Sequence, residues 1–409
     1  MTKNFDQQYK TLMRGVAEIT PADEFKERLG ASIENNQPLR VKQGFDPTAP
    51  DIHLGHTVGI RKLKQFQDLG HQVVLIVGDY TALVGDPSGR SSARPPLGHE
   101  EILENAKTYQ DQFFRILDKE KTEVHFNGSW FSKMPLKELI SLTSKYTVAR
   151  MLERDDFEKR YKGGSPIFVH EFLYPLMQAY DSVEIKADIE IGATEQKFNL
   201  LVGRSIQPDY GLRGQMILTM PILVGLDGKM KMSKSSGNYV AVDDPPGEMF
   251  GKLMSIPDEL IVSYAELASD MPLARIAEIR EQLQSGSVNP MAPKKELAAL
   301  ITDMYHGAGS GDAARTAFEQ VFSHGQDPED MEEFDMSRYT DQTIWIVQLL
   351  TDAGLSKSNG EARRLIAGGG VSLDGERIED VDTKIKITRP AVLKVGKRRF
   401  RRLTTGTKD

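Results

Sequence analysis

The sequence predicts an α/β protein with a parallel sheet, followed by an α-helical domain and a small α+β domain. Three observations support this prediction. A strand, a helix and a second strand follow one another between Leu39 and Asp79, amphipathic helices without strands follow Pro245, and a short mixed region begins at Thr343. At 409 residues the chain is too long for one ordinary core, so we expect several domains.

The first predicted unit is a strand–helix–strand. A strand is expected at residues 39–43, and Ile60, Leu63, Phe66 and Leu69 then recur at helical spacing before Gly70. The apolar run "VVLIVGD" is typical of a strand buried on both faces. Strand, helix and strand over this length indicate a βαβ unit and a parallel sheet. The sheet region continues with a helix, "HEFLYPLMQAYDSVEI", and a strand, "MILTMPILVGLDG".

The remainder of the chain changes in character. "MAPKKELAALITDMYHG" and "DAARTAFEQVFSHG" read as amphipathic helices, and the acidic stretch "GQDPEDMEEFDMSRYTD" reads as a linker. Two helices, "TIWIVQLLTDAG" and "SNGEARRLIAGGG", precede short strands around "VSLDGERI" and "KVGKRRFRRL". We therefore place boundaries that give domains 1–228, 229–328 and 343–409, with a linker at 329–342.

Composition narrows the class of protein. Hydrophobic residues make up 39% and charged residues 27%, the mix of a soluble globular protein. No apolar run approaches the roughly 20 residues that a membrane helix needs, and the N-terminus lacks the features of a signal peptide. We expect a cytoplasmic protein without a membrane partner. Cysteine is absent, which excludes disulfides and thiolate metal sites.

Charge is unevenly distributed. The net charge of −7 argues against a general nucleic-acid binder. From Thr343 to Asp409, however, 14 lysines and arginines face 8 acidic residues, a local charge of +6 that leaves −13 for the rest. A basic tail domain on an acidic body indicates a polyanion contact or a solvated charged surface, and charge alone does not separate the two.

The loop "GFDPTAPDIHLGHTVG" carries two histidines three residues apart. A zinc site needs three or four ligands, and there is no glutamate between them, so a metal pair is disfavoured. A structural turn stays possible. The loop, however, leaves a parallel strand at its carboxyl end and opens a helix near His56, where α/β sheets bind ligands and helix N-termini attract anions. Gly55 would let a flat ring or a phosphate approach the backbone.

The pentamer "KMSKS", Lys231 to Ser235, follows a strand and, together with "HLGH", resembles the two signatures of class I aminoacyl-tRNA synthetases. "GFDPTAPDIHLGH", "GDPSGR", "YPLMQAYD", "GATEQKFN" and the basic tail resemble the bacterial tyrosyl-tRNA synthetases, over nearly the whole chain. The resemblance implies a Rossmann-like catalytic domain that binds ATP and tyrosine, then the KMSKS loop with an α-helical anticodon-arm domain, and a C-terminal S4-like RNA-binding domain.

Members of this family join L-tyrosine to tRNA(Tyr) with ATP, through a tyrosyl-adenylate. The resemblance thus implies ATP accompanied by Mg2+, L-tyrosine and tRNA(Tyr) as partners, a homodimer with its contact around residues 136–172, and no structural metal. The positions that it marks as catalytic are Thr48, His53, His56, Lys231 and Lys234. The positions that it marks as ATP-binding are Gly55, Arg90, Arg94, Glu195, Ser233 and Lys234.

Tyr174, Gln178 and Asp181 fall at i, i+4 and i+7 and share one helix face. These side chains make a poor core, so unless that face is solvated they should surround a polar group. The resemblance puts Tyr174 and Gln178 at the α-amino group of tyrosine and Asp181 at its phenolic hydroxyl. The full tyrosine-binding set that it implies is Lys42, Asp46, Thr81, Asp86, Tyr174, Gln178, Asp181 and Gln196. The implied tRNA-binding set is Arg363, Arg364, Lys397, Arg398 and Arg399.

The chain departs from the family pattern at three positions. Lys42 stands where many members have tyrosine, and we expect it either to pair with Asp181 or to point to solvent. Ala193 and Glu195 stand where glycine and aspartate are usual, which affects the expected contact of Glu195 with the ribose hydroxyls.

Two other classes of function remain open. A nucleotidyltransferase acting on another small acid would share the "HLGH" logic but would not need the basic tail. A synthetase-like RNA-binding regulator would be expected to lose Lys234, His53 or Asp181, and all three are present.

Overall fold

The computed structural model describes residues 4–47, 52–86, 98–323, 331–339, 342–396 and 399–404. The chain divides into two compact units, one of residues 1–245 with 252–308 and the other of residues 246–251 with 309–409. Each unit has its own sheet. The finer boundaries at 228, 328 and 342 stay predictions. Among the described residues, no helix has both the length and the apolar character that crossing a membrane requires.

The first unit is built on a six-stranded sheet in the order β1-β6-β5-β2-β3-β4. All neighbouring strands are parallel except β1, which runs antiparallel to β6, so the predicted parallel sheet is confirmed. Its strands are β1 (Glu18–Thr20), β2 (Arg40–Phe45), β3 (Gln72–Val77), β4 (Thr122–Phe126), β5 (Ile189–Ala193) and β6 (Met216–Met220). After β2 the chain adds β3 and β4 on one side of that strand, and it then returns to add β5 on the other side. The crevice at the carboxyl ends of β2 and β5 is therefore the switch point where such sheets bind ligands.

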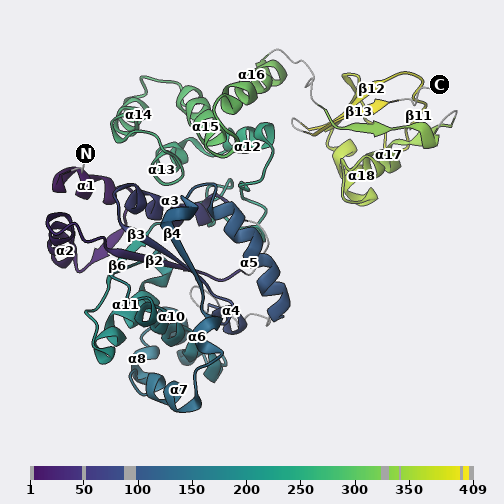
Figure 1. Cartoon of the computed structure of the whole chain (residues 1–409). Helices are drawn as coiled ribbons and strands as arrows, with labels where there is room; N and C mark the ends of the chain where they lie inside the picture. The colour runs from purple at the N-terminus through teal and green to yellow at the C-terminus, as the bar shows by residue number, and fades with distance from the viewer. Residues whose placement is uncertain are drawn as a thin grey trace. The chain divides into compact units, whose positions relative to one another are not determined.

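The central strand β3 explains why this sheet is buried on both sides. Val73, Val74, Leu75, Ile76 and Val77 are each at most 3% exposed. A strand can bury every side chain only when helices cover both faces, as in parallel sheets. In Figure 1, α3 lies above these strands and α10 and α11 lie below them.

Helices α3 and α11 pack directly on the sheet, α3 on β2 and β3 and α11 on β5 and β6. In α3, the predicted apolar positions Ile60, Leu63 and Phe66 are fully buried, and the helix ends just before Gly70, whose φ is +90°. The helices around the sheet are α1 (Phe5–Leu12), α2 (Ala22–Glu34), α3 (Leu54–Asp68), α4 (Thr81–Val84), α5 (His99–Phe113), α6 (Gly128–Phe131), α7 (Leu136–Thr143), α8 (Val148–Met151), α9 (Asp155–Lys162), α10 (Leu173–Glu184) and α11 (Lys197–Ile206). Short 3-10 turns are η1 (Lys119–Lys121), η2 (Val169–Phe172), η3 (Thr194–Gln196) and η4 (Gln207–Tyr210).

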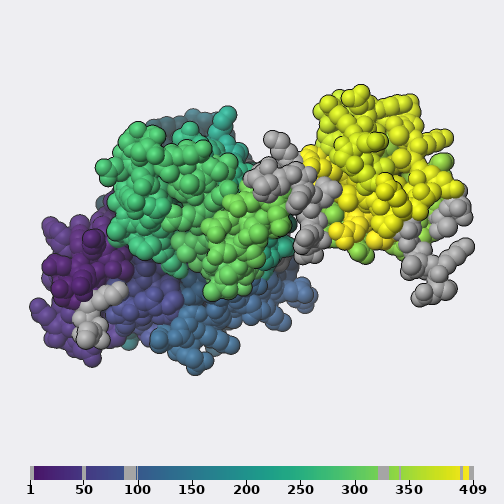
Figure 2. Space-filling view, turned by 90° about the horizontal axis from the view of Figure 1, so that it is seen from above, coloured from purple at the N-terminus to yellow at the C-terminus, as the bar shows by residue number. Residues whose placement is uncertain are grey.

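The later part of the first unit is helical, as predicted. It comprises η5 (Asp258–Leu260), α13 (Ile261–Leu267), α14 (Leu273–Ser285) and α15 (Met291–His306). Figure 2 shows these teal-to-green helices lying over the purple and blue N-terminal part of the same unit. Two contacts fix them there: the Arg14 guanidinium donates to the carbonyls of Glu266 and Met271, and the Tyr305 hydroxyl donates to Thr57 Oγ1 on α3. Helix α12 (Pro246–Leu253) includes residues of both units.

The second unit contains a small α+β domain, as predicted. Its elements are α16 (Ser310–Ser323), β7 (Glu333–Asp335), η6 (Ser337–Tyr339), β8 (Ile344–Trp345), α17 (Ile346–Asp352), α18 (Asn359–Ala367), β9 (Val371–Leu373), β10 (Glu376–Arg377), β11 (Lys384–Ile385), β12 (Ala391–Val395) and β13 (Arg399–Thr404). The main sheet runs β10-β9-β12-β13-β7, and β8 pairs with β11. Leu349 and Leu350 of α17 and Leu393 and Leu403 of the sheet are fully buried in its core.

The segment predicted as a linker, 329–342, contains an ordered strand. β7 pairs in parallel with β13, and Phe334 packs against the core of this domain. The sequence did not predict this strand. The segment is acidic, three residues are too few to show an alternating pattern, and their pairing depends on a strand far along the chain.

Candidate active site

A cavity of about 340 Å³ opens at the carboxyl ends of β2 and β5. Ten of the predicted site residues line it, namely Asp46, His53, Gly55, His56, Asp86, Tyr174, Glu195, Gln196, Lys231 and Ser233. Five predicted residues, Thr48, Arg90, Arg94, Lys397 and Arg398, lie outside the residues that the structure describes. The cavity thus gathers segments from "GFDP", "HLGH", "YPLMQAYD", "GATEQ" and "KMSKS", which are far apart in sequence.

The two histidines of "HLGH" stack at the start of α3. Their ring centroids lie 3.9 Å apart, and the backbone N–H of His53 donates to Nδ1 of His56. A Cβ at Gly55 would come within 3.0 Å of the His53 ring. The glycine is thus needed for the histidine pair itself, besides any approach of a ligand. Nδ1 of His53 is buried and has no hydrogen-bond partner among the described residues.

Both histidines are neutral at physiological pH. Burial lowers the pKa of His53 to about 3, with further lowering from His56 and Lys234 nearby. Burial lowers the pKa of His56 to about 4, again with a contribution from Lys234. A neutral imidazole keeps one N–H donor and one acceptor nitrogen. The pair can therefore donate hydrogen bonds to an anion without contributing charge.

The chain shortly after "KMSKS" lies against this histidine loop. His53 forms a β-bridge with Ala241, and the N–H of Leu54 donates to the carbonyl of Val240 at 3.0 Å. Nζ of Lys231 lies 3.1 Å from Oε1 of Glu195. Together with the effect of Lys234 on the histidine pKa values, these contacts bring the two signature motifs to one side of the cavity.

Asn238 organises the turn that carries the lysines, and sequence reasoning missed it. Its amide donates to Oδ2 of Asp227 at 2.8 Å and to the carbonyl of Lys231 at 3.2 Å, and its oxygen accepts from the N–H of Ser233. A Cβ at Gly225 would lie 2.3 Å from the Asn238 amide nitrogen. Gly225 therefore serves the close packing of this turn. No sequence signal marks an asparagine three residues after a motif as its organiser.

From Asp46 and Tyr174 in the cavity lining, a hydrogen-bond network leads to predicted residues that do not line the cavity, Thr81 and Asp181. Asp46, directly after β2, accepts from the hydroxyls of Thr81 and Tyr174, both at 2.8 Å. Burial and Asp46 raise the pKa of Tyr174 well above its ordinary value, so it stays protonated and donates. Asn127 then links the hydroxyl oxygen of Thr81, at 3.1 Å, to the carboxylate of Asp181, at 3.3 Å.

Asp181 is 3% exposed and lies at the far end of this network. Besides Asn127, it accepts from the indole Nε1–H of Trp130 at 3.0 Å. Burial raises the pKa of Asp181 to about 7, against a lowering by Lys42. Asn127 and Trp130 were not predicted. The stretch "FNGSW" follows β4, and polar residues directly after a buried strand were the signal that could have found them.

The remaining predicted pocket residues are Asp86, Gln196 and Glu195. Asp86 accepts from Gln196 Nε2 at 3.3 Å and from Asn199 Nδ2 at 3.4 Å. The Gln196 side-chain oxygen in turn accepts from the N–H of Ala193 at 2.9 Å. Glu195 is held by Lys231, and its expected contact with a ribose stays a prediction.

Both predictions for Lys42 are wrong. Its side chain is fully buried, and its ammonium pairs with Glu190 at 3.0 Å rather than with Asp181 or solvent. The reason is sheet register: Lys42 and Glu190 are direct partners on the neighbouring strands β2 and β5. Gln178 joins the same group, because its Nε2 donates to Glu190 at 2.9 Å.

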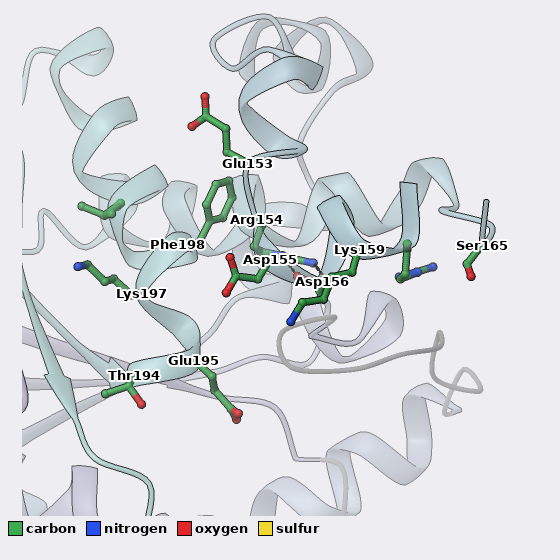
Figure 3. A pocket seen from close by; sticks show the side chains of 12 residues that line it. Glu153, Arg154, Asp155, Asp156, Lys159, Ser165, Thr194, Glu195, Lys197 and Phe198 are labelled. Atoms are coloured by element: carbon green, nitrogen blue, oxygen red, sulfur yellow. Dashed lines mark hydrogen bonds and ion pairs between the residues drawn. The ribbon is translucent and has the colours of Figure 1, made fainter. Parts of the chain in front are cut away.

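A second cavity, of about 750 Å³, adjoins the first and shares Glu195 with it. Figure 3 shows Thr194 and Glu195 below Asp155, Asp156 and Lys159, which come from the region of α9. Arg154 is paired with Asp156 and stacks on Phe157. This wall has mixed charge, and apart from Glu195 sequence reasoning assigned it no role.

Metal ligands are not clustered in the described part of the chain, where no group of three or more histidine, aspartate or glutamate side chains could hold an ion. The motif side of the cavity presents imidazoles and ammonium groups, and its carboxylate, Glu195, is paired with Lys231.

In the C-terminal domain, the described members of the predicted RNA-binding set are exposed. Arg363 and Arg364 project from α18, and Arg363 stacks over Trp345 with its guanidinium 5.1 Å from the ring centre. Arg399 donates to the carbonyl of Leu355 and lies 3.6 Å from a carboxylate oxygen of Glu361. Arg399 is thus partly engaged within the domain.

Comparison with known proteins agrees with this geometry. Residues 34–323 match the family model of class I tRNA synthetases for tryptophan and tyrosine, and residues 326–401 match that of the C-terminal domain of tyrosine–tRNA ligases. The tyrosine–tRNA ligase of Oleidesulfovibrio alaskensis is 53% identical over 98% of this chain and 99% of its own length. That of Thermotoga maritima is 52% identical over 98% of each chain.

Solved structures agree in fold. The tyrosyl-tRNA synthetase of Archaeoglobus fulgidus, crystallised with L-tyrosine, matches with a TM-score of 0.63 and 23% identity over 76% of this chain and 100% of that one. A truncated mitochondrial enzyme from Aspergillus nidulans matches with a TM-score of 0.64 and 21% identity, over 78% and 94%. The family resemblance found in the sequence is confirmed, and the chain belongs to the tyrosine–tRNA ligases among the class I aminoacyl-tRNA synthetases.

Proposed function

We propose that this protein is a tyrosine–tRNA ligase, which converts L-tyrosine and ATP to tyrosyl-adenylate and pyrophosphate and then transfers the tyrosyl group to the 3′ end of tRNA(Tyr). The observation that carries the proposal is that one cavity combines the histidine pair and "KMSKS" with a network ending at the buried carboxylate of Asp181. The first feature suits a triphosphate, and the second suits a phenol.

The first step needs little covalent help from the protein. A carboxylate oxygen of tyrosine bonds to the α-phosphorus of ATP, and the bond from that phosphorus to the bridging oxygen breaks, so that pyrophosphate leaves with its electrons. Catalysis then consists of positioning and of stabilising charge on the phosphate oxygens. His53 and His56 supply neutral donors, and Lys231 and Lys234 supply cations that close on the leaving pyrophosphate.

Further nucleotide contacts are proposed from the family pattern. Thr48 would act with His53 at the terminal phosphates, Gly55 would let the nucleotide approach the start of α3, and Ser233 would contribute a polar group from "KMSKS". Arg90 and Arg94 match two further basic positions, and Glu195 matches the ribose position. Mg2+ would arrive with ATP and share the charge of its phosphates.

The amino-acid network supports recognition of tyrosine. Tyr174 and Gln178 would hold the α-ammonium together with Thr81, Asp86 and the supporting carboxylate of Asp46, and Gln196 would close the pocket; Lys42 acts indirectly, as argued below. Asp181 would accept the phenolic O–H. Phenylalanine lacks that group and would leave a buried acceptor unpaired, which is costly. Tyrosyl-tRNA synthetases are a standard example of discrimination by this principle.

The C-terminal domain supports binding of tRNA(Tyr) through phosphates and shape. The exposed arginines Arg363, Arg364 and Arg399, with Lys397 and Arg398, would contribute to a basic surface. Removal of residues after Asp341 should spare adenylate formation and impair aminoacylation. Aminoacylation at the rate of the full chain in moderate salt would contradict this role.

A homodimer is supported by apolar side chains that stand exposed around the region from α7 to η2. Leu136 is 71% exposed, Val148 61%, Phe168 52% and Val169 80%. A second copy of the chain would cover such a patch. Sedimentation of the full-length protein tests this, and a monomer at micromolar concentration would reject it. The compartment that fits a tRNA substrate and the absence of a described membrane helix is the cytoplasm.

The decisive test of the function is ATP–pyrophosphate exchange with each of the twenty amino acids. We expect exchange with L-tyrosine and background exchange with phenylalanine and tryptophan. A nucleotidyltransferase for another acid would respond to none of the twenty. A regulator on a synthetase scaffold would bind RNA without exchanging pyrophosphate.

A further inference from the structure

Lys42 and Glu190 form a buried ion pair beneath the amino-acid side of the cavity. They are direct register partners on β2 and β5, so both side chains leave the same face of the sheet. Both are fully buried, and Nζ lies 3.0 Å from Oε1. Burying two charges has a large desolvation cost, and apolar residues in their place are often neutral or stabilising. Stability is therefore a weak explanation for this pair.

The contacts of the pair converge on α10, the helix that carries the tyrosine-binding residues. The Lys42 ammonium donates to the carbonyl of Gln178 at 2.8 Å and to Oγ of Ser182 at 2.7 Å, besides Glu190. All three of its protons are thus placed. Glu190 accepts from Gln178 Nε2 at 2.9 Å, from Ser182 Oγ at 3.3 Å and from the side chain of Gln215.

This arrangement fixes the orientation of the Gln178 amide. An ionised carboxylate only accepts hydrogen bonds, so Glu190 requires the NH2 group of Gln178 to face it. The amide oxygen of Gln178 must then point away from Glu190. That oxygen is buried and has no hydrogen-bond partner among the described residues. A buried acceptor without a partner is costly unless a ligand supplies the donor.

We propose that Lys42 and Glu190 are positioning residues for amino-acid recognition, which hold the Gln178 amide with its oxygen presented to the α-ammonium of bound tyrosine. The inference rests on the proposed function, which puts that ammonium at Gln178. Glu190 selects the orientation of the amide. Lys42 compensates the charge of Glu190 and ties the pair to the backbone of α10.

Lys42 also has an electrostatic role in this pair. Lys42 lowers the pKa of Asp181, whereas Glu190 raises it. A lone carboxylate at Glu190 would therefore oppose ionisation of the phenol acceptor one turn along α10. With Lys42 opposite it, the pair orients Gln178 without a net charge near Asp181.

The test is the double variant Lys42→Met with Glu190→Met, which removes both charges together and keeps the side-chain volume. Two ligands are compared by calorimetry, L-tyrosine and 3-(4-hydroxyphenyl)propanoate, which lacks only the ammonium. We expect the preference for L-tyrosine to fall about tenfold to a hundredfold, the range for a hydrogen bond to a charged group. Binding of the deaminated ligand should stay unchanged.

Two controls separate positioning from general damage. Lys62→Met removes another buried lysine, whose Nζ donates to the carbonyls of Leu12 and Arg14 and not to α10, and it should leave the ligand preference intact. In a Gln178→Ala background, the double substitution should have no further effect on the preference. An equal loss for both ligands, or an unchanged preference in the folded double variant, would overturn the proposal.

A structure of the unaltered protein with L-tyrosine tests the same idea without a variant, and decides it if the double variant does not fold. We expect the ammonium within hydrogen-bond distance of the Gln178 amide, and that amide still bonded to Glu190. An amide turned away from Glu190, or an ammonium held elsewhere, would reject the inference. If the unaltered protein does not bind L-tyrosine at all, the proposed function fails, which is a distinct result.

Discussion

The two ends of the cavity are built in different ways. The phosphate end, defined by His53, His56, Lys231 and Lys234, comes from a loop, the start of α3 and a glycine-flanked turn, and the Lys231 side chain is 49% exposed. The proposed amino-acid end consists of Asp46 and Tyr174, which line the cavity, and of Gln178 and Asp181, which follow Tyr174 on α10 and do not line it. There Asp181 is 3% exposed.

Hydrogen bonding does not separate the two ends in the same way. Asp46 accepts from Thr81 and Tyr174, and Asp181 accepts from Asn127 and Trp130. Each end also has a buried polar atom without a partner among the described residues, Nδ1 of His53 at one and Oε1 of Gln178 at the other. The two ends thus differ in exposure and in the elements that carry them, and we expect the functions proposed for them to respond separately to substitution.

The largest expected effect comes from breaking the phosphate end. Lys234→Ala removes a cation that we expect to act on the transition state, so the rate of adenylate formation should fall about 100-fold to 1,000-fold. Binding of ATP should weaken far less. Single-turnover formation of adenylate at several ATP concentrations separates the two. Lys229→Ala, in the same turn but outside the motif, is the matched control. Equal losses of rate and ATP affinity would contradict a transition-state role.

Breaking the amino-acid end should alter selectivity instead. Asp181→Asn keeps the shape of the side chain but replaces a charged acceptor of the phenolic O–H by a neutral amide. We expect kcat/KM for tyrosine to fall about tenfold to 150-fold, with little change for phenylalanine. Pyrophosphate exchange with both amino acids measures the ratio. The comparison of the two ends fails if ATP binding falls as much as tyrosine selectivity.

The sequence anticipated these two ends unequally. Helical spacing put Tyr174, Gln178 and Asp181 on one face, and the structure has all three on α10. Paired motifs likewise anticipated that "HLGH" and "KMSKS" line one cavity. The partner of Lys42 could not be found in this way, because the register between β2 and β5 depends on a strand order that local patterns do not encode.

The supporting residues were missed for a related reason. Asn127 directly follows β4 and Trp130 lies on the short helix α6, and they reach Asp181 only because this segment and α10 come together in the folded chain. Asn238 acts on the backbone of its own turn. Side chains that position others carry no motif, so their roles become visible only from contacts. The fold class needed only periodicity and element order, which is why it was predicted correctly although several strands, among them β1, β4, β5 and β7, were not.

A pH titration of tyrosine binding tests the amino-acid end, and its expected effect is smaller than that of the two substitutions above. Because the pKa of Asp181 is raised to about 7, its carboxylate becomes protonated as the pH falls through that value and is then a poorer acceptor. Between about pH 8 and about pH 6, the Kd for L-tyrosine should rise about tenfold. The histidines, with pKa values of about 3 and 4, should stay neutral throughout. Calorimetry without ATP measures this, and Asp181→Asn should give a flat profile. A flat profile for the unaltered protein would show that another group sets tyrosine affinity.

The smallest effect is expected from loosening the turn that carries the lysines. Asn238→Ala removes three hydrogen bonds that shape the turn around Lys231 and Ser233 without removing any group expected to touch ATP. The adenylation rate should fall about threefold to tenfold, because part of the population would no longer hold the lysines in place. The Kd for L-tyrosine should not change, since none of these three hydrogen bonds is made to Asp46, Tyr174, Gln178 or Asp181. The adenylation rate and the Kd for L-tyrosine are measured in one preparation. A parallel loss of tyrosine affinity would mean that the two ends are not built independently.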